Sequence, residues 1–335
     1  MGLVRLLLAV SVVLFHVLMF PQSGAGWLRD LPLSPIPGTA AVEAFFLISG
    51  FAISGALATK YRTAGTFYVS RIRRLFPAYL AILALELLGA VYVWDLPGFH
   101  KIWREGQDWS ILERAAWAWT NVAMLGKELW QFTDRLGFEF VSPAWSLSIE
   151  LQFYLLAPLI VRLRTPTLVA LLIAALVARA GMVQNLPYDP FVYYTLPGQA
   201  CLFLLGALAY RLRVKLIHSP IVAALLVAAA TMAFPQGTTA APIDLWKLIY
   251  FAVLFALLPS LSHEGRVDSY LAALSYPLYL IHLPVIYVLL TVWSAWPWWG
   301  VFAALGLSLA GAALVHELVE KPARALRFSA LARAA

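Results

Sequence analysis

Apolar residues fall into runs of about twenty, interrupted by proline, glycine or clustered charges. A helix of that length crosses the hydrocarbon core of a bilayer. We therefore expect an all-α polytopic membrane bundle of about ten transmembrane helices, with no separate soluble domain: a transmembrane domain over 1–322 and a short basic cytoplasmic tail over 323–335. The expected spans lie near residues 3–20, 38–59, 75–95, 143–162, 166–182, 191–210, 219–235, 243–261, 270–292 and 296–319.

The distribution of charge predicts how these spans are oriented. Hydrophobic residues make up 62% of the chain and charged residues 12%, which excludes an ordinary soluble enzyme. The net charge of +7 is divided among short loops rather than gathered in one patch, so we expect no nucleic-acid partner. Sixteen of the 24 basic residues fall on one side of the predicted bundle. Because Lys and Arg collect on the cytoplasmic side, both termini are predicted to be cytoplasmic.

One long segment, 96–142, is not expected to span the membrane. Its five tryptophans suggest that it lies along the outer membrane–water interface, where it can cover the mouth of a cavity. The single cysteine, Cys201, excludes an intramolecular disulfide and a cysteine-based metal site. We expect no metal site. The sequence carries no signal for the oligomeric state.

Two polar residues interrupt the first apolar run, Arg5 and His16. Eleven residues of helix rise about 16 Å, so Arg5 is predicted at one membrane face and His16 well inside the bilayer. An ionisable group at that depth indicates a functional site. The alternative is a secretory signal peptide, but His16 and the following Pro21 interrupt its apolar core.

Three further ionisable residues share the middle or outer half of the membrane: Glu43, Glu150 and His282. The loop 21–37 is short enough to make the first two helices antiparallel neighbours, and His16 and Glu43 then have similar depths. We therefore expect a carboxylate–imidazole contact between them, which would fix the tautomer of a general base. The alternative is that all four residues are hydrogen-bond partners that hold helices together. Four such groups at compatible depths favour a functional site.

The cytoplasmic end carries a different chemistry. Arg71, Arg73 and Arg74 precede Pro77 near the start of the third span, where guanidinium groups favour phosphate. Membrane topology alone would also explain a basic loop. The presence of Arg5 at the same face favours a phosphate site.

These residues carry a family resemblance. The matching motifs, in chain order, are Arg5-x10-His16; Glu43 with Phe45-Phe46-x-x-Ser49-Gly50-Phe51; Arg71-x-x-Arg74 with Pro77; Trp145-Ser-Leu-Ser-x-Glu150-x-x-Phe153-Tyr154; Ser275-Tyr276-x-x-Tyr279-Leu-x-His282-x-Pro284; and Glu320-x-Pro322. The chain resembles the acyltransferase 3 family of integral-membrane acyltransferases, which includes bacterial enzymes that O-acetylate surface polysaccharides, nodulation factors and macrolides. Membership implies an O-acyltransferase of the bacterial cytoplasmic membrane, and acyl-CoA, most simply acetyl-CoA, as a cytoplasmic co-substrate. It further implies a carbohydrate or similar hydroxyl acceptor near the far side and no tightly bound cofactor.

The resemblance and the depth of each residue, counted along its helix, together assign roles to the candidate site residues. His16 is expected to take the proton of the acceptor hydroxyl, oriented by Glu43, and Glu150 is a further acid–base candidate; a covalent acyl-histidine intermediate stays open. The expected substrate-binding residues are Arg5, Ser49, Arg71, Arg74, Trp145, Ser146, Ser148, Tyr154, Tyr279 and His282. The rival function is a proton-coupled transporter in which the buried His and Glu residues form a relay. A weaker one is a non-catalytic polysaccharide-binding scaffold.

Overall fold

The structure is a computed structural model that describes residues 1–29, 31, 33–92, 109–132, 140–235, 245–261, 265–293 and 295–325. Its α-helices are α1 (Gly2–Met19), α2 (Gly38–Thr59), α3 (Ala64–Tyr92), α5 (Ile111–Ala123), α6 (Trp145–Ile160), α7 (Thr165–Asn185), α8 (Leu196–Leu212), α9 (Pro220–Met232), α10 (Leu245–Leu257), α11 (Arg266–Val292) and α12 (Gly300–Val315). Two strands of two residues each, β1 (Leu33–Ser34) and β2 (Phe234–Pro235), pair antiparallel with Leu33 opposite Pro235. The fold is therefore helical, as expected.

Short helical turns join or extend these elements. The 3₁₀ turns are η1 (Pro21–Ser23), η2 (Ala25–Arg29), η4 (Lys127–Phe132), η5 (Ser142–Ala144) and η7 (Leu258–Leu261), and the π-helical turns are η6 (Tyr188–Val192) and η8 (His316–Glu320).

Each expected span corresponds to a helix, but the helices differ in length. Within the described ranges, five are long and apolar enough to cross a membrane: Gly2–Met19, Gly38–Thr59, Thr165–Asn185, Arg266–Val292 and Gly300–Ala325. Three shorter apolar helices occupy Leu196–Leu212, Pro220–Met232 and Leu245–Leu261. The length and apolar composition of these helices indicate an integral membrane protein. The total of ten membrane crossings stays a prediction. Helix α3 contains the charged arginine cluster, and α6, with 16 residues, is shorter than a typical spanning helix.

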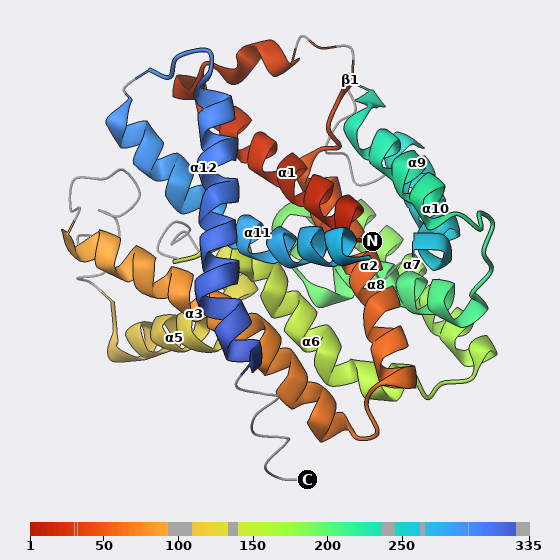
Figure 1. The fold of residues 1–335 in the computed structure, drawn as a ribbon. Helices are drawn as coiled ribbons and strands as arrows, with labels where there is room; N and C mark the ends of the chain where they lie inside the picture. The colour runs from red at the N-terminus through yellow and green to blue at the C-terminus, as the bar shows by residue number, and fades with distance from the viewer. Residues whose placement is uncertain are drawn as a thin grey trace.

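Two helix pairs form the centre of the bundle, α1 with α11 and α2 with α8. Figure 1 shows α1 between α12 on one side and the α9–α10 pair on the other. The α2–α8 pair packs through glycines: a Cβ on Gly50 would lie 2.0 Å from the carbonyl oxygen of Phe203, and one on Gly206 would lie 2.0 Å from that of Leu47. Small residues at these positions therefore allow α2 and α8 to pack closely.

The described part of the segment 96–142 contains a helix, α5. Ser110 and Glu113 form a capping box at its start, in which each side chain accepts from the other residue's backbone N–H. The rings of Trp109 and Trp130 stack 5.7 Å apart beside it, and Trp119 is exposed. The proposed interfacial location of the segment remains a prediction; Trp103 lies outside the described residues.

Candidate active site

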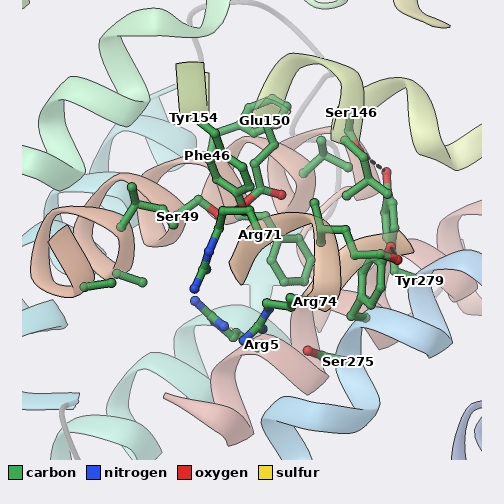
Figure 2. Close-up of a pocket in the computed structure, with 18 residues that line it drawn as sticks. Arg5, Phe46, Ser49, Arg71, Arg74, Ser146, Glu150, Tyr154, Ser275 and Tyr279 are labelled. Atoms are coloured by element: carbon green, nitrogen blue, oxygen red, sulfur yellow. Dashed lines mark hydrogen bonds between the residues drawn. The ribbon is translucent and has the colours of Figure 1, made fainter. Parts of the chain in front are cut away.

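A cavity of about 250 Å³ lies between α1, α2, α3, α6 and α11. Figure 2 shows arginines at one end of it, a carboxylate in the middle and a serine–tyrosine pair at the other end. Its polar lining residues are Arg5, Ser49, Arg71, Arg74, Ser146, Glu150, Tyr154, Ser275, Tyr276 and Tyr279. Seven of the ten expected substrate-binding residues therefore line one cavity, together with the acid–base candidate Glu150. Ser275 and Tyr276 belong to the sequence motif around His282 but were not assigned a site role.

Three arginines from two helices converge at the first end of the cavity: Arg5 from α1, and Arg71 and Arg74 from α3 (Figure 2). In the described part of the chain, the Nε atoms of Arg5 and Arg71 are buried without a hydrogen-bond partner. A buried guanidinium N–H without an acceptor carries a desolvation cost that a bound anion removes. This end of the cavity is therefore suited to bind an anionic group.

Arg71 is held in place by aromatic residues. Its guanidinium lies 5.5–5.9 Å from the ring centroids of Tyr61, Phe67 and Tyr154, and its Nη2 donates to the Tyr61 hydroxyl over 3.2 Å. Burial alone would raise the pKa of Tyr61, but its hydrogen bonds with Ser70 and Arg71 lower that pKa overall. Sequence reasoning missed Tyr61, which lies in the short loop between α2 and α3.

Glu150 lies in the middle of the cavity. Its Oε1 accepts hydrogen bonds of 2.6 Å from the Ser49 hydroxyl and from the Tyr154 hydroxyl. Tyr154 is on the same helical face one turn away, as the i,i+4 spacing predicts. The carboxylate is thus fixed by α2 and α6, at the level where the arginine end meets the rest of the cavity (Figure 2).

The far end of the cavity is formed by Ser146 and Tyr279. Their hydroxyls are 2.8 Å apart, and Tyr279 also donates to the carbonyl oxygen of Pro143 over 3.0 Å. The ring of Tyr279 lies 6.1 Å from that of His282. Tyr279 therefore stands between the cavity and His282, which is fully buried.

His16 and His282 contact each other. His282 Nε2 lies 3.1 Å from His16 Nδ1, and His16 Nδ1 also lies 2.9 Å from the carbonyl oxygen of Val12. The two rings come from α1 and α11, the helix pair at the centre of the bundle. Neither histidine is among the residues that line the described cavity, so they lie beyond its Tyr279 end.

Glu43 has a different environment from the one expected. Its Oε1 and Oε2 form ion pairs of 2.5 Å with Arg179 and Lys247, respectively. Arg179 also donates to Gln199 Oε1 and to the Gly198 carbonyl, so the triad joins α2, α7, α8 and α10. The expected Glu43–His16 pair is thus wrong: the ring partner of His16 is His282. Sequence reasoning had placed Arg179 and Lys247 among the charges of the outer side.

Besides His282, two expected substrate-binding residues do not line the cavity. Trp145 packs against Tyr193 and Tyr194, with ring centroids 5.0 and 4.4 Å away. The Ser148 hydroxyl, fully buried, accepts from the backbone N–H of Gly126 over 2.9 Å. Both residues tie α6 to neighbouring segments of the chain.

Comparison with known proteins identifies the family. The profile of a family described as an acyltransferase domain matches residues 1–317, nearly the whole chain. The chain belongs to this acyltransferase 3 family. It is therefore a membrane O-acyltransferase, and the cavity with its neighbouring histidine pair is the candidate active site of that enzyme.

Individual relatives are consistent with the family. A protein of Rhizobium leguminosarum bv. viciae named nodulation protein 10 is 30% identical, over 99% of this chain and 94% of its own length. A Staphylococcus aureus protein, provisionally named an O-acetyltransferase, is 26% identical over 47% of this chain and 23% of its own length. An uncharacterised Haemophilus influenzae protein is 28% identical over 46% of this chain and 66% of its own length. No solved structure matches this acyltransferase.

Within the described ranges, no group of three or more His, Cys, Asp or Glu side chains is placed to hold a metal ion. His316, Glu320 and Arg324 form ion pairs with one another just after α12.

Proposed function

We propose that this acyltransferase moves an acyl group, most simply acetyl, from cytoplasmic acyl-CoA to a hydroxyl of a surface or exported glycan or a similar acceptor. The observation that carries the proposal is the arginine end of the cavity, where buried Nε atoms of Arg5 and Arg71 have no acceptor of their own. Phosphate oxygens are the natural partners of such guanidinium groups. An acyl-CoA brings phosphates at one end and a thioester at the end of a narrow arm.

The dimensions of the cavity suit that arm. Drug-sized ligands occupy pockets of about 300–1,000 Å³, and this cavity, at about 250 Å³, has room for an arm rather than for a whole nucleotide. We infer that the nucleotide stays at the cytoplasmic mouth near Arg5, Arg71 and Arg74. The eleven-residue rise from Arg5 to His16, about 16 Å, then separates the phosphates from the reacting carbon. The thioester reaches His16 past the side chain of Tyr279.

The proposed chemistry is direct transfer. His16 Nε2 takes the proton from the acceptor hydroxyl as the oxygen attacks the thioester carbonyl. The carbon–sulfur bond breaks, and the CoA thiolate takes up the proton from His16, so the products are the O-acyl ester and free CoA. Tyr279, whose ring lies 6.1 Å from that of His282, and Ser146, whose hydroxyl lies 2.8 Å from that of Tyr279, are the proposed donors to the oxyanion. Both hydroxyls donate to the carbonyl oxygen of Pro143 in the structure and turn to the oxyanion in this proposal.

The name of one relative, provisionally given for O-acetyl transfer, supports this class of reaction. The bacterial cytoplasmic membrane, with both termini cytoplasmic, is the proposed location, because it gives the arginine end of the cavity access to cytoplasmic acyl-CoA.

The transporter alternative requires a relay between the buried ionisable groups. In the described part of the chain these groups divide into separate sets: Glu43 binds two cations, Glu150 accepts from two hydroxyls, and the two histidines contact each other. This division favours acyl transfer, in which each set has its own task.

The test is single-turnover consumption of labelled acetyl-CoA by the detergent-purified full-length chain, with and without a crude polysaccharide acceptor. We expect transfer by wild type and loss of transfer with retained donor binding in His16→Ala. His218→Ala, on the exposed loop after α8, is the matched control and should behave as wild type. Failure of wild type to bind any short-chain acyl-CoA would overturn the donor assignment.

A further inference from the structure

The geometry of the histidine pair determines which ring nitrogens carry protons. His16 Nδ1 lies 2.9 Å from the carbonyl oxygen of Val12, and His282 Nδ1 lies 3.3 Å from the carbonyl oxygen of Leu278. A carbonyl oxygen can only accept a hydrogen bond. Each Nδ1 is therefore a donor, and both neutral rings carry their proton on Nδ1.

The contact between the two rings then has only one direction. With its proton on Nδ1, neutral His282 presents a bare Nε2. This atom, 3.1 Å away, shares the one His16 Nδ1–H with the carbonyl oxygen of Val12, 2.9 Å away. In the opposite arrangement, His282 Nε2–H would donate to His16 Nδ1. The Nδ1 lone pairs of both neutral rings would then face backbone carbonyl oxygens, which repel them. In the favoured arrangement, the Nε2 atom of His16 is the one ring nitrogen of the two histidines whose lone pair is not engaged by a described residue, and it is free to take a proton.

We propose that His282 is a positioning residue that holds His16 in the Nδ1–H tautomer and accepts from its ring when His16 Nε2 becomes protonated. This inference rests on the proposed function, in which His16 is the base. His282 thus takes the place that a carboxylate occupies in a catalytic triad. The difference is that it does so as a neutral ring.

The membrane setting explains why a neutral acceptor is suitable here. His282 is a fully buried residue of α11 at its contact with α1, where an unpaired carboxylate would be costly. The nearest expected carboxylate, Glu43, is already bound by two cations. When His16 gains its proton, the His282 ring stabilises the resulting imidazolium without adding a negative charge to the apolar interior.

Two amide substitutions at position 282 separate the roles of the two ring nitrogens. A glutamine can place an acceptor oxygen where Nε2 lies, whereas an asparagine places its polar atoms near Nδ1, out of reach of His16. We expect His282→Asn to lower kcat about 10- to 100-fold, the value of one hydrogen bond to a charged group, with KM for acetyl-CoA nearly unchanged. His282→Gln should retain most of the activity.

The matched control is His316→Gln, which alters a buried histidine that pairs with Glu320 and does not line the cavity. It should leave kcat unchanged. A second measurement does not depend on the folding of variants: ¹⁵N chemical shifts of histidine-labelled wild type should show His16 and His282 protonated on Nδ1. Equal kcat in His282→Asn and wild type, or a His16 ring protonated on Nε2 at neutral pH, would overturn the inference. Equal kcat in His282→Asn leaves the proposed acyl transfer standing, whereas a neutral His16 ring protonated on Nε2 would also contradict the assignment of His16 Nε2 as the base. The proposed function itself fails if wild type binds no short-chain acyl-CoA or if His16→Ala remains active.

Discussion

Replacing Arg71 should weaken donor binding without changing the chemical step. The guanidinium lines the arginine end of the cavity, and its buried Nε has no acceptor in the described part of the chain. A hydrogen bond to a charged group is worth about 1.5–3 kcal/mol. Arg71→Met should therefore raise KM for acetyl-CoA about 10- to 150-fold, with kcat within about threefold of wild type.

Arg71→Lys separates the charge from the geometry. Lysine keeps the positive charge but loses the planar fork and the stacking on Tyr61, Phe67 and Tyr154, which lie 5.5–5.9 Å from the guanidinium. We expect an intermediate rise in KM. The assay is equilibrium binding of labelled CoA together with initial rates, and thermal melting checks that each variant is folded.

The neighbouring Arg73 provides the matched control. It is exposed on the same helix and does not line the cavity, so Arg73→Met removes the same charge without removing a ligand contact. Its effect on KM should be small and should vanish at high salt, because exposed charges are screened. If Arg73→Met weakens binding as much as Arg71→Met does, the arginine end is not a built anion site and the reasoning fails.

Three further predictions concern the surroundings of the cavity. Tyr61→Phe removes the hydroxyl that accepts from the Arg71 guanidinium and should raise KM about 2- to 10-fold at constant kcat, measured by initial rates. Gly50→Ala should cost about 1–3 kcal/mol of stability, since its Cβ would lie 2.0 Å from a carbonyl oxygen in α8; Gly65→Ala, with open space around it, is the control in thermal melting. Glu43→Gln leaves two buried cations with a neutral partner and should cost about 3–5 kcal/mol, whereas Glu317→Gln, which breaks an exposed pair, should cost at most about 1 kcal/mol. Folded Glu43→Gln protein with normal stability and a greatly reduced kcat would instead assign Glu43 to catalysis.

The sequence predicted much of the cavity because its residues repeat at helical spacing. Glu150 and Tyr154, one turn apart on α6, lie together as expected, and Tyr154 donates to Glu150. The arginines of α1 and α3 share a membrane face, and counting residues along each helix was enough to bring them to the same level. Depth along a helix can be counted from sequence.

Rotation about a helix axis and lateral order cannot be counted in this way. His16 and Glu43 have similar depths, but His16 faces α11 whereas Glu43 faces α7 and α10. The depth count could have found the true partners of Glu43. Arg179 lies near the C-terminal end of α7 and Lys247 near the N-terminal end of α10, the ends that the predicted topology places at the outer side together with Glu43. An ionisable residue inside an apolar run needs a buried partner, but Arg179 and Lys247 were counted only toward the basic charge of the outer side.

The distribution of charge inside the bundle separates structural ion pairs from the proposed site. Glu43 is matched by Arg179 and Lys247, and Glu320 by His316 and Arg324. At the cavity, three arginines face a single carboxylate, Glu150, which already accepts from two hydroxyls. A surplus of buried positive charge is unfavourable in a membrane protein unless water or a bound anion compensates it. Ion pairs within the bundle do not account for that surplus of positive charge, whereas the proposed anionic donor, with its phosphates at the arginines and its neutral arm directed toward His16, does.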